Sequence, residues 1–207
     1  MNVTGQPLDV RQHIMDTAQP IISGKGFSAV GLNEILSAAG VPKGSFYHYF
    51  SSKEAFGEAL LGCYFSKYLE ELDTLLEKPG FSGAERLMSY WQKWLETQAA
   101  CDPQGKCLAV KLGAEVSDLS EAMRGALLSG TARIIKRLTR AVEAGMEDGS
   151  LVVEGDPSRV AETLYQMWLG ASLLAKITRD QKPLNAALAA TYGLLRLEAP
   201  AVERPQF

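Results

Sequence analysis

Apolar residues recur at three- and four-residue spacing along almost the whole chain, and the alternation of apolar and polar residues that is typical of strands is nearly absent. This spacing places apolar side chains on one face of a helix. Glycine and proline residues separate the periodic segments, as expected at helix ends. The pattern therefore predicts an all-α fold of about nine helices.

The first predicted helix runs from about Asp9 to Ser23. Two short helices are predicted next, at Leu32–Ala39 and Lys43–Tyr49, with Gly40 between them and Pro42 suited to a first helical position. Two short helices joined through a glycine turn form a helix-turn-helix. The N-terminal part is therefore predicted to be a three-helix domain that contains this motif.

Six longer helices are predicted after these. Ser51 and Glu54 have the spacing of a capping box, which predicts the start of a fourth helix whose apolar face reaches Leu75. Asp118 and Glu121 have the same spacing before the seventh helix. The remaining helices are predicted at Gly83–Ala100, Lys106–Val116, Leu119–Asp148, Pro157–Arg179 and Pro183–Leu197.

The composition describes a chain that can bury a full core, with 207 residues of which 46% are hydrophobic. No apolar stretch approaches the roughly 18 residues of a membrane span, and no signal peptide precedes the first helix, so we expect a cytoplasmic protein without membrane contact. The three cysteines Cys63, Cys101 and Cys107 lack the spacing of a disulfide framework. They are expected to be reduced thiols.

The charge pattern favours no class of partner. The net charge is −3, and in the first 56 residues four basic residues balance four acidic ones. A DNA-binding domain without a basic excess would bind non-specific DNA only modestly. The motifs, and not the composition, must therefore indicate the function.

The second short helix has two distinct faces. Phe46 and Phe50 are four residues apart, so both can anchor the helix on a core. Polar and small residues on the opposite face can reach base edges in the major groove. These outward residues are Lys43, Gly44, Ser45, Tyr47 and His48. Tyr47, His48 and Lys53 are candidates for phosphate contacts, and the alternative is that the aromatic residues only cover a seam between domains.

The TetR family of transcriptional repressors has a DNA-binding signature that this region resembles closely: GF at 26–27, LNEIL at 32–36, AGVPKGSFYHYF at 39–50 and SKE at 52–54. The resemblance covers about residues 9–60. It implies a homodimer that binds double-stranded operator DNA at paired half-sites. The sequence departs from the family at Val30, Gly31 and Pro42, where hydroxyl residues are usual or common, so we expect no side-chain cap from these positions.

The resemblance also implies how the chain is organised. It predicts a helix-turn-helix DNA-binding domain at residues 1–55 and a helical sensing and dimerisation domain at residues 56–207. Three further segments are similar to the NemR-like subgroup, whose repressors respond to reactive electrophiles and oxidants: CLAVKLGAEV at 107–116, DLSEAMR at 118–124 and WLGASLLAK at 168–176.

Cys107 is the candidate sensing residue. It lies at a predicted helix start, where the helix dipole, Lys106 and Lys111 would favour the reactive thiolate. The resemblance implies Lys176 as its partner, either as an ion pair with the thiolate or as a nucleophile towards oxidised sulfur. The alternative is that Cys107 is an inert buried residue. Cys63 is expected in the core.

Two further groups of residues are candidates for the sensing domain. A ligand cavity between helices is one interpretation of a set of large residues that are otherwise simply core: Tyr90, Trp91, Trp94, Met123, Leu127, Met167 and Trp168. A self-complementary dimer contact is the interpretation of apolar and small residues on the last two helices, which would otherwise form the centre of a monomer. These are Leu169, Gly170, Leu173, Leu184, Leu188 and Tyr192.

The sequence offers no catalytic residues, no metal site and no cofactor motif, and its only two histidines have no ligand spacing. We therefore expect a regulator and not an enzyme. Two alternatives remain at this point. The chain can be a repressor induced by reversible binding of a small organic ligand, or a helical interaction protein that does not bind DNA.

Overall fold

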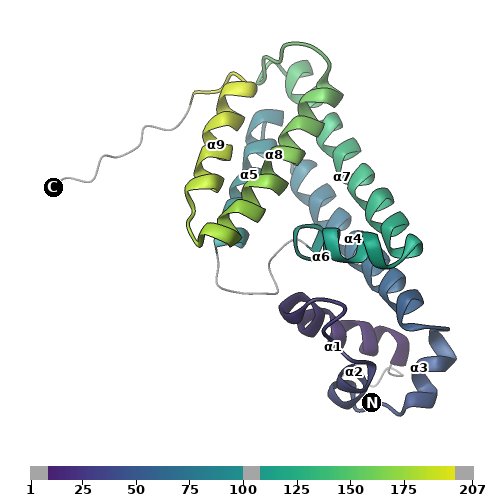
Figure 1. Ribbon diagram of the computed structural model, residues 1–207. Coiled ribbons are helices and arrows are strands. Elements are labelled where there is room, and N and C mark those ends of the chain that lie inside the picture. Colours follow the sequence, from purple (N-terminus) through teal and green to yellow (C-terminus); the bar gives the residue numbers. More distant parts are fainter. Residues whose placement is uncertain (1–8, 100–107, 199–207) are drawn as a thin grey trace. The chain divides into compact units, whose positions relative to one another are not determined.

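The computed structural model describes residues 9–99 and 108–198, and within them it contains nine helices and no strand (Figure 1). This confirms the prediction of an all-α fold. The helices are α1 (Val10–Lys25), α2 (Leu32–Ala39), α3 (Lys43–Tyr49), α4 (Lys53–Leu76), α5 (Gly83–Ala99), α6 (Leu108–Leu119), α7 (Glu121–Glu147), α8 (Pro157–Thr178) and α9 (Lys182–Leu194).

The chain forms two compact units. The first comprises Met1–Tyr68 and Ala100–Ala132, and the second comprises Leu69–Ala99 and Arg133–Phe207. The first unit therefore contains α1–α3, α6 and the N-terminal parts of α4 and α7. The second contains α5, α8, α9 and the C-terminal parts of α4 and α7. The predicted functional boundary near residue 55 stays a prediction, because these units are defined by packing alone.

Helices α1–α3, which we call the head, form the predicted helix-turn-helix. Asp9 caps α1 by accepting a hydrogen bond from the Gln12 backbone N–H at 3.2 Å. Gly40 ends α2 with a positive φ of 65°, which glycine adopts without steric cost. The Val41 N–H then donates to the Leu36 carbonyl at 3.1 Å, so the turn between α2 and α3 is fixed by its own backbone.

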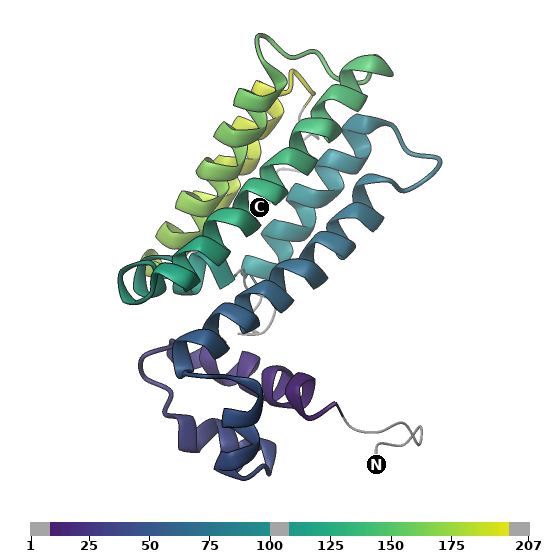
Figure 2. The same ribbon diagram turned by 90° about the vertical axis from the view of Figure 1, so that its right-hand side faces the viewer.

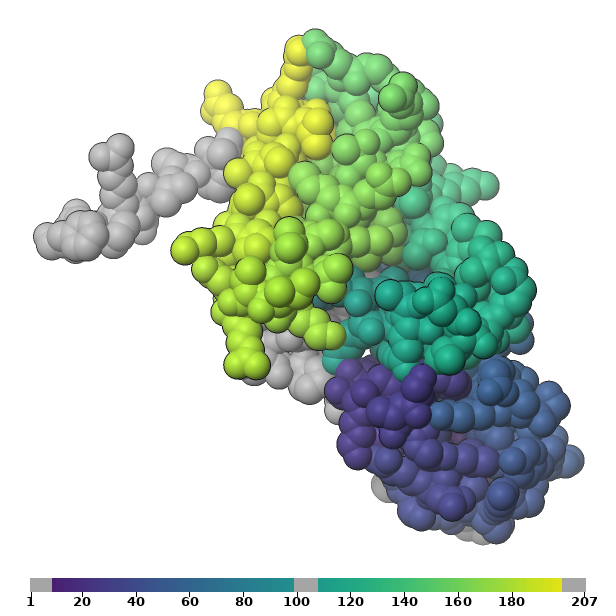
Figure 3. Space-filling view, in the orientation of Figure 1, coloured from purple at the N-terminus to yellow at the C-terminus, as the bar shows by residue number. Residues whose placement is uncertain are grey.

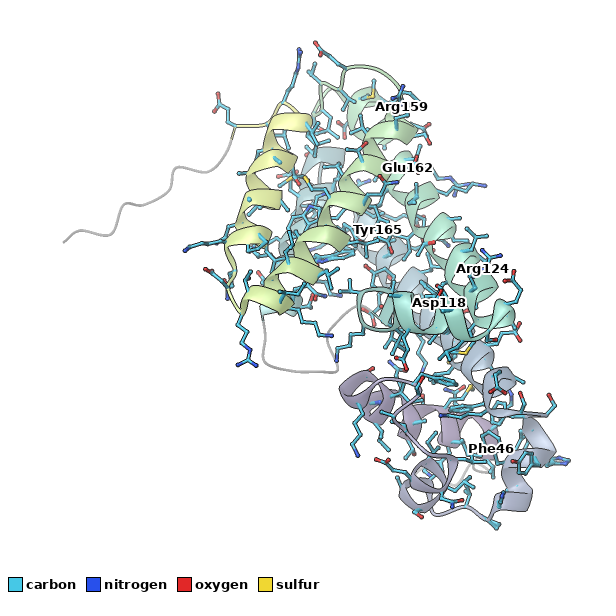
Figure 4. The ribbon with its side chains drawn as sticks, viewed as in Figure 1. Phe46, Asp118, Arg124, Arg159, Glu162 and Tyr165 are labelled. Carbon is cyan, nitrogen blue, oxygen red and sulfur yellow. The ribbon has the colours of Figure 1, made fainter. Side chains whose placement is uncertain are left out.

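The core of the head is built on Phe46, which is 0% exposed and lies within the head in Figure 4. Its ring lies 5.1 Å from that of Phe50 and 5.5 Å from that of Phe56 on α4. Apolar residues of α1 and α2 complete this core: Ile14, Ala18, Ile22, Ile35, Leu36 and Ala39. The four-residue spacing of Phe46 and Phe50 thus holds α3 in place with its other face outward.

Both predicted capping boxes are displaced by one or two residues. Ser52, and not Ser51, stands before α4, and its hydroxyl accepts from the Ala55 N–H at 3.1 Å. Helix α6 continues to Leu119, and Ser120 caps α7 by accepting from the Met123 N–H at 3.3 Å. In both cases a serine directly before the first turn reaches a free N–H.

The turn between α6 and α7 lies between Asp118 and Arg124, both labelled in Figure 4. As expected, Gly31 and Pro42 precede α2 and α3 without any side-chain cap. These two short helices therefore depend on packing for their stability.

The second unit is held by a cluster of aromatic residues. Helices α8 and α9 lie side by side in both ribbon views (Figures 1 and 2). The rings of Trp91 on α5 and Trp168 on α8 stack with centroids 5.2 Å apart. Trp168 donates to the Thr191 hydroxyl on α9 at 3.0 Å, so the cluster joins three helices.

We expect Phe46→Ala to lower the free energy of unfolding by about 3–5 kcal/mol, because a fully buried aromatic side chain would leave a cavity. Tyr47→Ala is the matched control, because Tyr47 is 51% exposed on the same helix and its loss should change stability by less than about 0.5 kcal/mol. Urea unfolding followed by circular dichroism measures both. Equal losses for the two variants would contradict the described core.

Candidate DNA-binding and sensing sites

The outward face of α3 carries the residues predicted to contact DNA. Lys43, Gly44, Tyr47 and His48 are exposed, and Ser45 is half-buried. The Lys43 ammonium lies 5.8 Å from the centre of the Tyr47 ring, so these two side chains lie against each other. The face is thus available to a partner, and its contact with DNA stays a prediction.

Lys53 has a structural role in addition to its predicted one. Its ammonium donates to the Phe27 carbonyl at 2.9 Å and lies 4.7 Å above the Phe27 ring. Lys25 is also engaged, in an ion pair with Glu34 at 2.5 Å. Both cations therefore have a partner within the protein, but only the charge of Lys25 is compensated by a carboxylate.

Cys63 is not a core residue as expected but is half-buried on α4. The amide nitrogen of Gln12 on α1 lies 3.5 Å from its sulfur. One turn further, Lys67 forms an ion pair with Asp16 at 2.8 Å. A small polar seam between α1 and α4 therefore surrounds this thiol, because Gln12 and Asp16 lie one turn apart on the same face of α1.

Two side chains of α6 bind the end of α1 and the loop that follows it. We call these two side chains, Lys111 and Glu115, the α6 clamp. Glu115 accepts hydrogen bonds from the backbone N–H groups of Ser28 at 2.6 Å and Phe27 at 3.1 Å. Lys111, one turn earlier, donates to the carbonyl of Ser23. Figure 3 shows α6 directly against α1.

Gly26 makes this close approach possible. Its φ of 93° suits glycine, and a β-carbon there would lie only 3.1 Å from a Glu115 carboxylate oxygen. The helix pattern predicts a glycine at the end of α1 but not its contact with α6. The clamp was therefore missed, because its partners are 87 or 88 residues apart in the chain.

The clamp also changes the acidity of Glu115. Partial burial alone would raise the pKa of this carboxyl group, but the hydrogen bonds from Ser28 and Phe27 outweigh it, so the pKa lies below its ordinary value. Glu115 therefore stays ionised at neutral pH and can bind both N–H groups as a carboxylate.

The candidate sensing residues are only partly described. Cys107, Cys101 and Lys106 lie outside the described residues. Lys176 is exposed in the last turn of α8. The first residue of α6, Leu108, directly follows Cys107 in the sequence, and its backbone N–H donates to the Tyr64 hydroxyl on α4 at 3.3 Å. The predicted proximity of Cys107 and Lys176 stays a prediction.

The residues predicted to line one cavity are divided between the two units, and their role in a ligand cavity stays a prediction. Tyr90, Trp91, Trp94 and Trp168 are packed together in the second unit, which also contains the half-buried Met167. Met123 and Leu127 are buried in the first unit, where Met123 packs against Gly57 of α4. The sequence pattern predicts that these residues are large and apolar, but it does not predict which unit each one belongs to.

Two polar groups of the aromatic cluster differ in their partners. The Trp94 indole donates to the Ser172 hydroxyl at 2.9 Å. The indole nitrogen of Trp91 is buried and has no hydrogen-bond partner among the described residues. A buried N–H without a partner is uncommon, so this position is a candidate for a hydrogen bond to a ligand.

The predicted dimer residues are only partly exposed. Leu173 is 49% exposed, Gly170 is exposed, and Leu169, Leu188 and Tyr192 are half-buried. Leu184 is 1% exposed and so belongs to the core of its own chain, which corrects its assignment to the interface. Two further apolar residues of α8 are exposed: Leu174 and Ile177 are 52% and 67% exposed.

Leu173 and Leu174 lie four and three positions before Ile177, so each is a neighbour of Ile177 on the surface of α8. Exposed apolar side chains that lie next to one another favour a contact with another chain, and the dimer contact at α8 stays a prediction. Across the residues described, no three or more His, Cys, Asp or Glu side chains are grouped to hold a metal ion. None of the helices described is long and apolar enough to cross a membrane.

A short helix with an exposed polar face, fixed on a three-helix core, defines this protein as a DNA-binding regulator of the helix-turn-helix class. Residues 14–60 match the family "Bacterial regulatory proteins, tetR family", and residues 83–191 match "Tetracyclin repressor-like, C-terminal domain". The chain belongs to the TetR family of bacterial regulatory proteins.

Similar proteins extend over nearly the whole chain. The HTH-type transcriptional repressor NemR of Escherichia coli is 42% identical over 92% of this chain and 96% of its own length. The crystal structure of the reduced form of E. coli NemR covers 94% of this chain and 100% of its own, with a TM-score of 0.86 and 43% identity. The repressor DhaR of a Mycobacterium species is 34% identical over 90% of this chain and 92% of its own length.

The lowered pKa of Glu115 predicts a pH-dependent contribution to stability. A carboxyl group whose pKa is lowered by folding stabilises the folded state above its ordinary pKa of 4.5, and this stabilisation is lost as the pH falls through the folded value. We expect Glu115→Gln to be less stable than wild type by about 1 kcal/mol at pH 7. The difference should shrink below pH 4.5.

Thermal unfolding between pH 7 and pH 3.5 measures this difference. Glu58→Gln is the control, because Glu58 is exposed on α4 and has no described hydrogen bond. A constant difference between Glu115→Gln and wild type at every pH would show that the carboxylate charge does not stabilise the clamp.

Proposed function

We propose that this chain is a transcriptional repressor that binds operator DNA as a homodimer and is released when a reactive electrophile or oxidant modifies Cys107. The repressor NemR, 42% identical to this chain, supports repression. A solved structure of NemR described as a reduced form supports a redox-sensitive state. Such a regulator acts on DNA in the cytoplasm, with no catalytic role and no cofactor.

The α6 clamp is the observation that carries the proposal. Cys107 immediately precedes α6 in the sequence. Four residues later Lys111 binds the last turn of α1, and after one more turn Glu115 binds the loop between α1 and α2. A helix moves as one rigid element, so a group attached at its N-terminal end can displace both contacts.

The Cys107 thiolate can react with both classes of signal. A thiolate adds to the electron-poor carbon of an activated alkene, forming a C–S bond, and the neighbouring carbon takes a proton. With hypochlorous acid the sulfur takes the chlorine and hydroxide leaves. Water then replaces chloride to give a sulfenic acid. In that second case the sulfur loses two electrons and the chlorine gains them.

Lys176 is the proposed reaction partner of Cys107 after oxidation. Its neutral amine can attack the sulfur of the sulfenic acid, so that an S–N bond forms and water leaves. Before oxidation, its ammonium can stabilise the Cys107 thiolate as an ion pair. The exposure of Lys176 at the end of α8 is compatible with either role, because its amine is free to approach a partner.

Release follows from the geometry of two half-sites. The two recognition helices of a dimer must match half-sites about 34–36 Å apart, or a multiple of this spacing. A displacement of α6 would pull on the Ser23 carbonyl and on the N–H groups of Phe27 and Ser28, and so turn the head. A change of a few ångströms at each head would prevent both from binding together.

Reversible binding of a small organic ligand is the second candidate function. The buried Trp91 indole N–H without a partner favours it, because a ligand carbonyl or carboxylate could accept a hydrogen bond there. In this case the cysteines would not be needed for release.

Membership of the TetR family argues against the other alternative, a helical interaction protein that does not bind DNA.

We expect wild type to leave its own upstream DNA in a gel shift when N-ethylmaleimide or hypochlorite is added, and Cys107→Ser to stay bound. The physical reason is that serine cannot be alkylated or oxidised under these conditions. Cys63→Ser and Cys101→Ser are the matched controls and should be released like wild type. Equal release of Cys107→Ser and wild type would show that another thiol is the switch.

We also expect Glu115→Gln to leave the alkylation of Cys107 unchanged but to weaken the release from DNA that follows it. Mass spectrometry should show Cys107 alkylated at the wild-type rate, because residue 115 is two helical turns away from residue 107. The change in DNA affinity on alkylation should fall by about tenfold or more, because a weakened clamp transmits less displacement to the head. A wild-type change in affinity would contradict the clamp as the link.

A further inference from the structure

The head and the start of α4 contain four basic residues, and the structure separates them into two pairs. Lys25 is neutralised by Glu34 in an ion pair of 2.5 Å, and Lys53 is bound to the Phe27 carbonyl. Arg11 and Lys43 are exposed and have no carboxylate partner within the described residues. Lys53 keeps its charge, because a carbonyl is a neutral partner, but its ammonium is held in place. Within the described part of the head, Arg11 and Lys43 are therefore the cations whose end groups are held by neither a carboxylate nor a backbone carbonyl.

Arg11 lies at the end of α3 opposite to Lys43. It is the second residue of α1, and its guanidinium carbon lies 5.4 Å from the centre of the Phe50 ring. Phe50 directly follows α3 and is only 3% exposed, so its ring is a fixed support. Lys43 is the first residue of α3. The two unpaired cations therefore stand at the two ends of the recognition helix.

We infer that Arg11 binds a DNA phosphate and that Arg11 and Lys43 together position α3 along the major groove. Helix α3 has 7 residues and is about 10 Å long, comparable to a major groove of about 12 Å. Phosphate contacts at both ends would fix the helix along the groove without reading sequence. The sequence pattern alone assigns no role to Arg11.

The Phe50 ring makes Arg11 suitable for this task. A guanidinium group stacked on an aromatic face loses little further freedom when it binds, and its planar donors match two phosphate oxygens. Lysine would keep the charge but not the planar, stacked geometry. The inference depends on DNA binding by the head but not on Cys107, so it can fail while the sensing proposal holds.

The test is the salt dependence of DNA binding by the full-length dimer, measured by fluorescence anisotropy on two duplexes. One is the chain's own upstream DNA and the other is a duplex of random sequence. Arg11→Gln removes the charge and keeps a long side chain. Arg11→Lys keeps the charge, and Lys25→Gln is the matched control because its cation is already paired.

We expect Arg11→Gln to lower the slope of log K against log salt by about 0.9 per protomer on both duplexes, with a loss on the order of tenfold per protomer at 0.1 M salt. Arg11→Lys should keep most of the wild-type slope. Lys25→Gln should keep the wild-type slope and affinity. Melting temperatures of all variants check that each is folded.

Three results would overturn the inference. The first is a wild-type slope for Arg11→Gln. The second is a loss confined to the upstream duplex, which would make Arg11 a base contact. The third is an equal loss of slope for Arg11→Gln and Arg11→Lys, which would show that charge is not the cause. A wild type that binds neither duplex would instead contradict DNA binding by the chain itself.

Discussion

The carboxylate of Glu115 accepts two successive backbone N–H groups, those of Phe27 and Ser28, and the function proposed for this molecule depends on that contact. These N–H groups lie in the loop between α1 and α2, where the helices leave backbone donors without partners. A carboxylate satisfies two such donors at once and holds a charge there that a neutral group could not supply. Because the Lys111 ammonium binds the Ser23 carbonyl, α6 holds both the last turn of α1 and the loop that follows it.

This contact explains why α6, which follows the predicted sensing residue Cys107, packs in the same unit as the DNA-binding helices. Sequence order would place α6 in the middle of the sensing domain. Packing places it on α1, with Gly26 leaving room for Glu115. If Cys107 is the sensing residue, as proposed, its signal would need no long path through the second unit, because α6 itself contacts α1 and the loop that follows it.

The parts of this arrangement that the sequence predicts are local ones. The spacing of Phe46 and Phe50, the glycine after α2 and the proline before α3 are enough to predict the helix-turn-helix and its outward face, because each depends on neighbours within one or two turns. The clamp joins residues 88 positions apart, and no periodic pattern records such a pair. Burial was equally hard to predict: Leu184 and Leu173 are both apolar on adjacent helices, yet one is 1% and the other 49% exposed. Hydrophobicity shows that a side chain favours apolar contacts. It does not show whether residues of the same chain provide those contacts.

The small number of free cations on the head has a consequence for release. Each phosphate contact contributes on the order of tenfold to affinity at 0.1 M salt, so a head with few free cations is expected to bind DNA weakly by itself. Strong binding then requires both heads of a dimer at once, because the second contact is made at a high effective concentration. A head with many lysines would stay on DNA after its partner had left. Engagement of Lys25 by Glu34 and of Lys53 by the Phe27 carbonyl would leave each head dependent on the other. In the proposed mechanism, that dependence would let a small rotation of the head, applied through the α6 clamp, release the dimer.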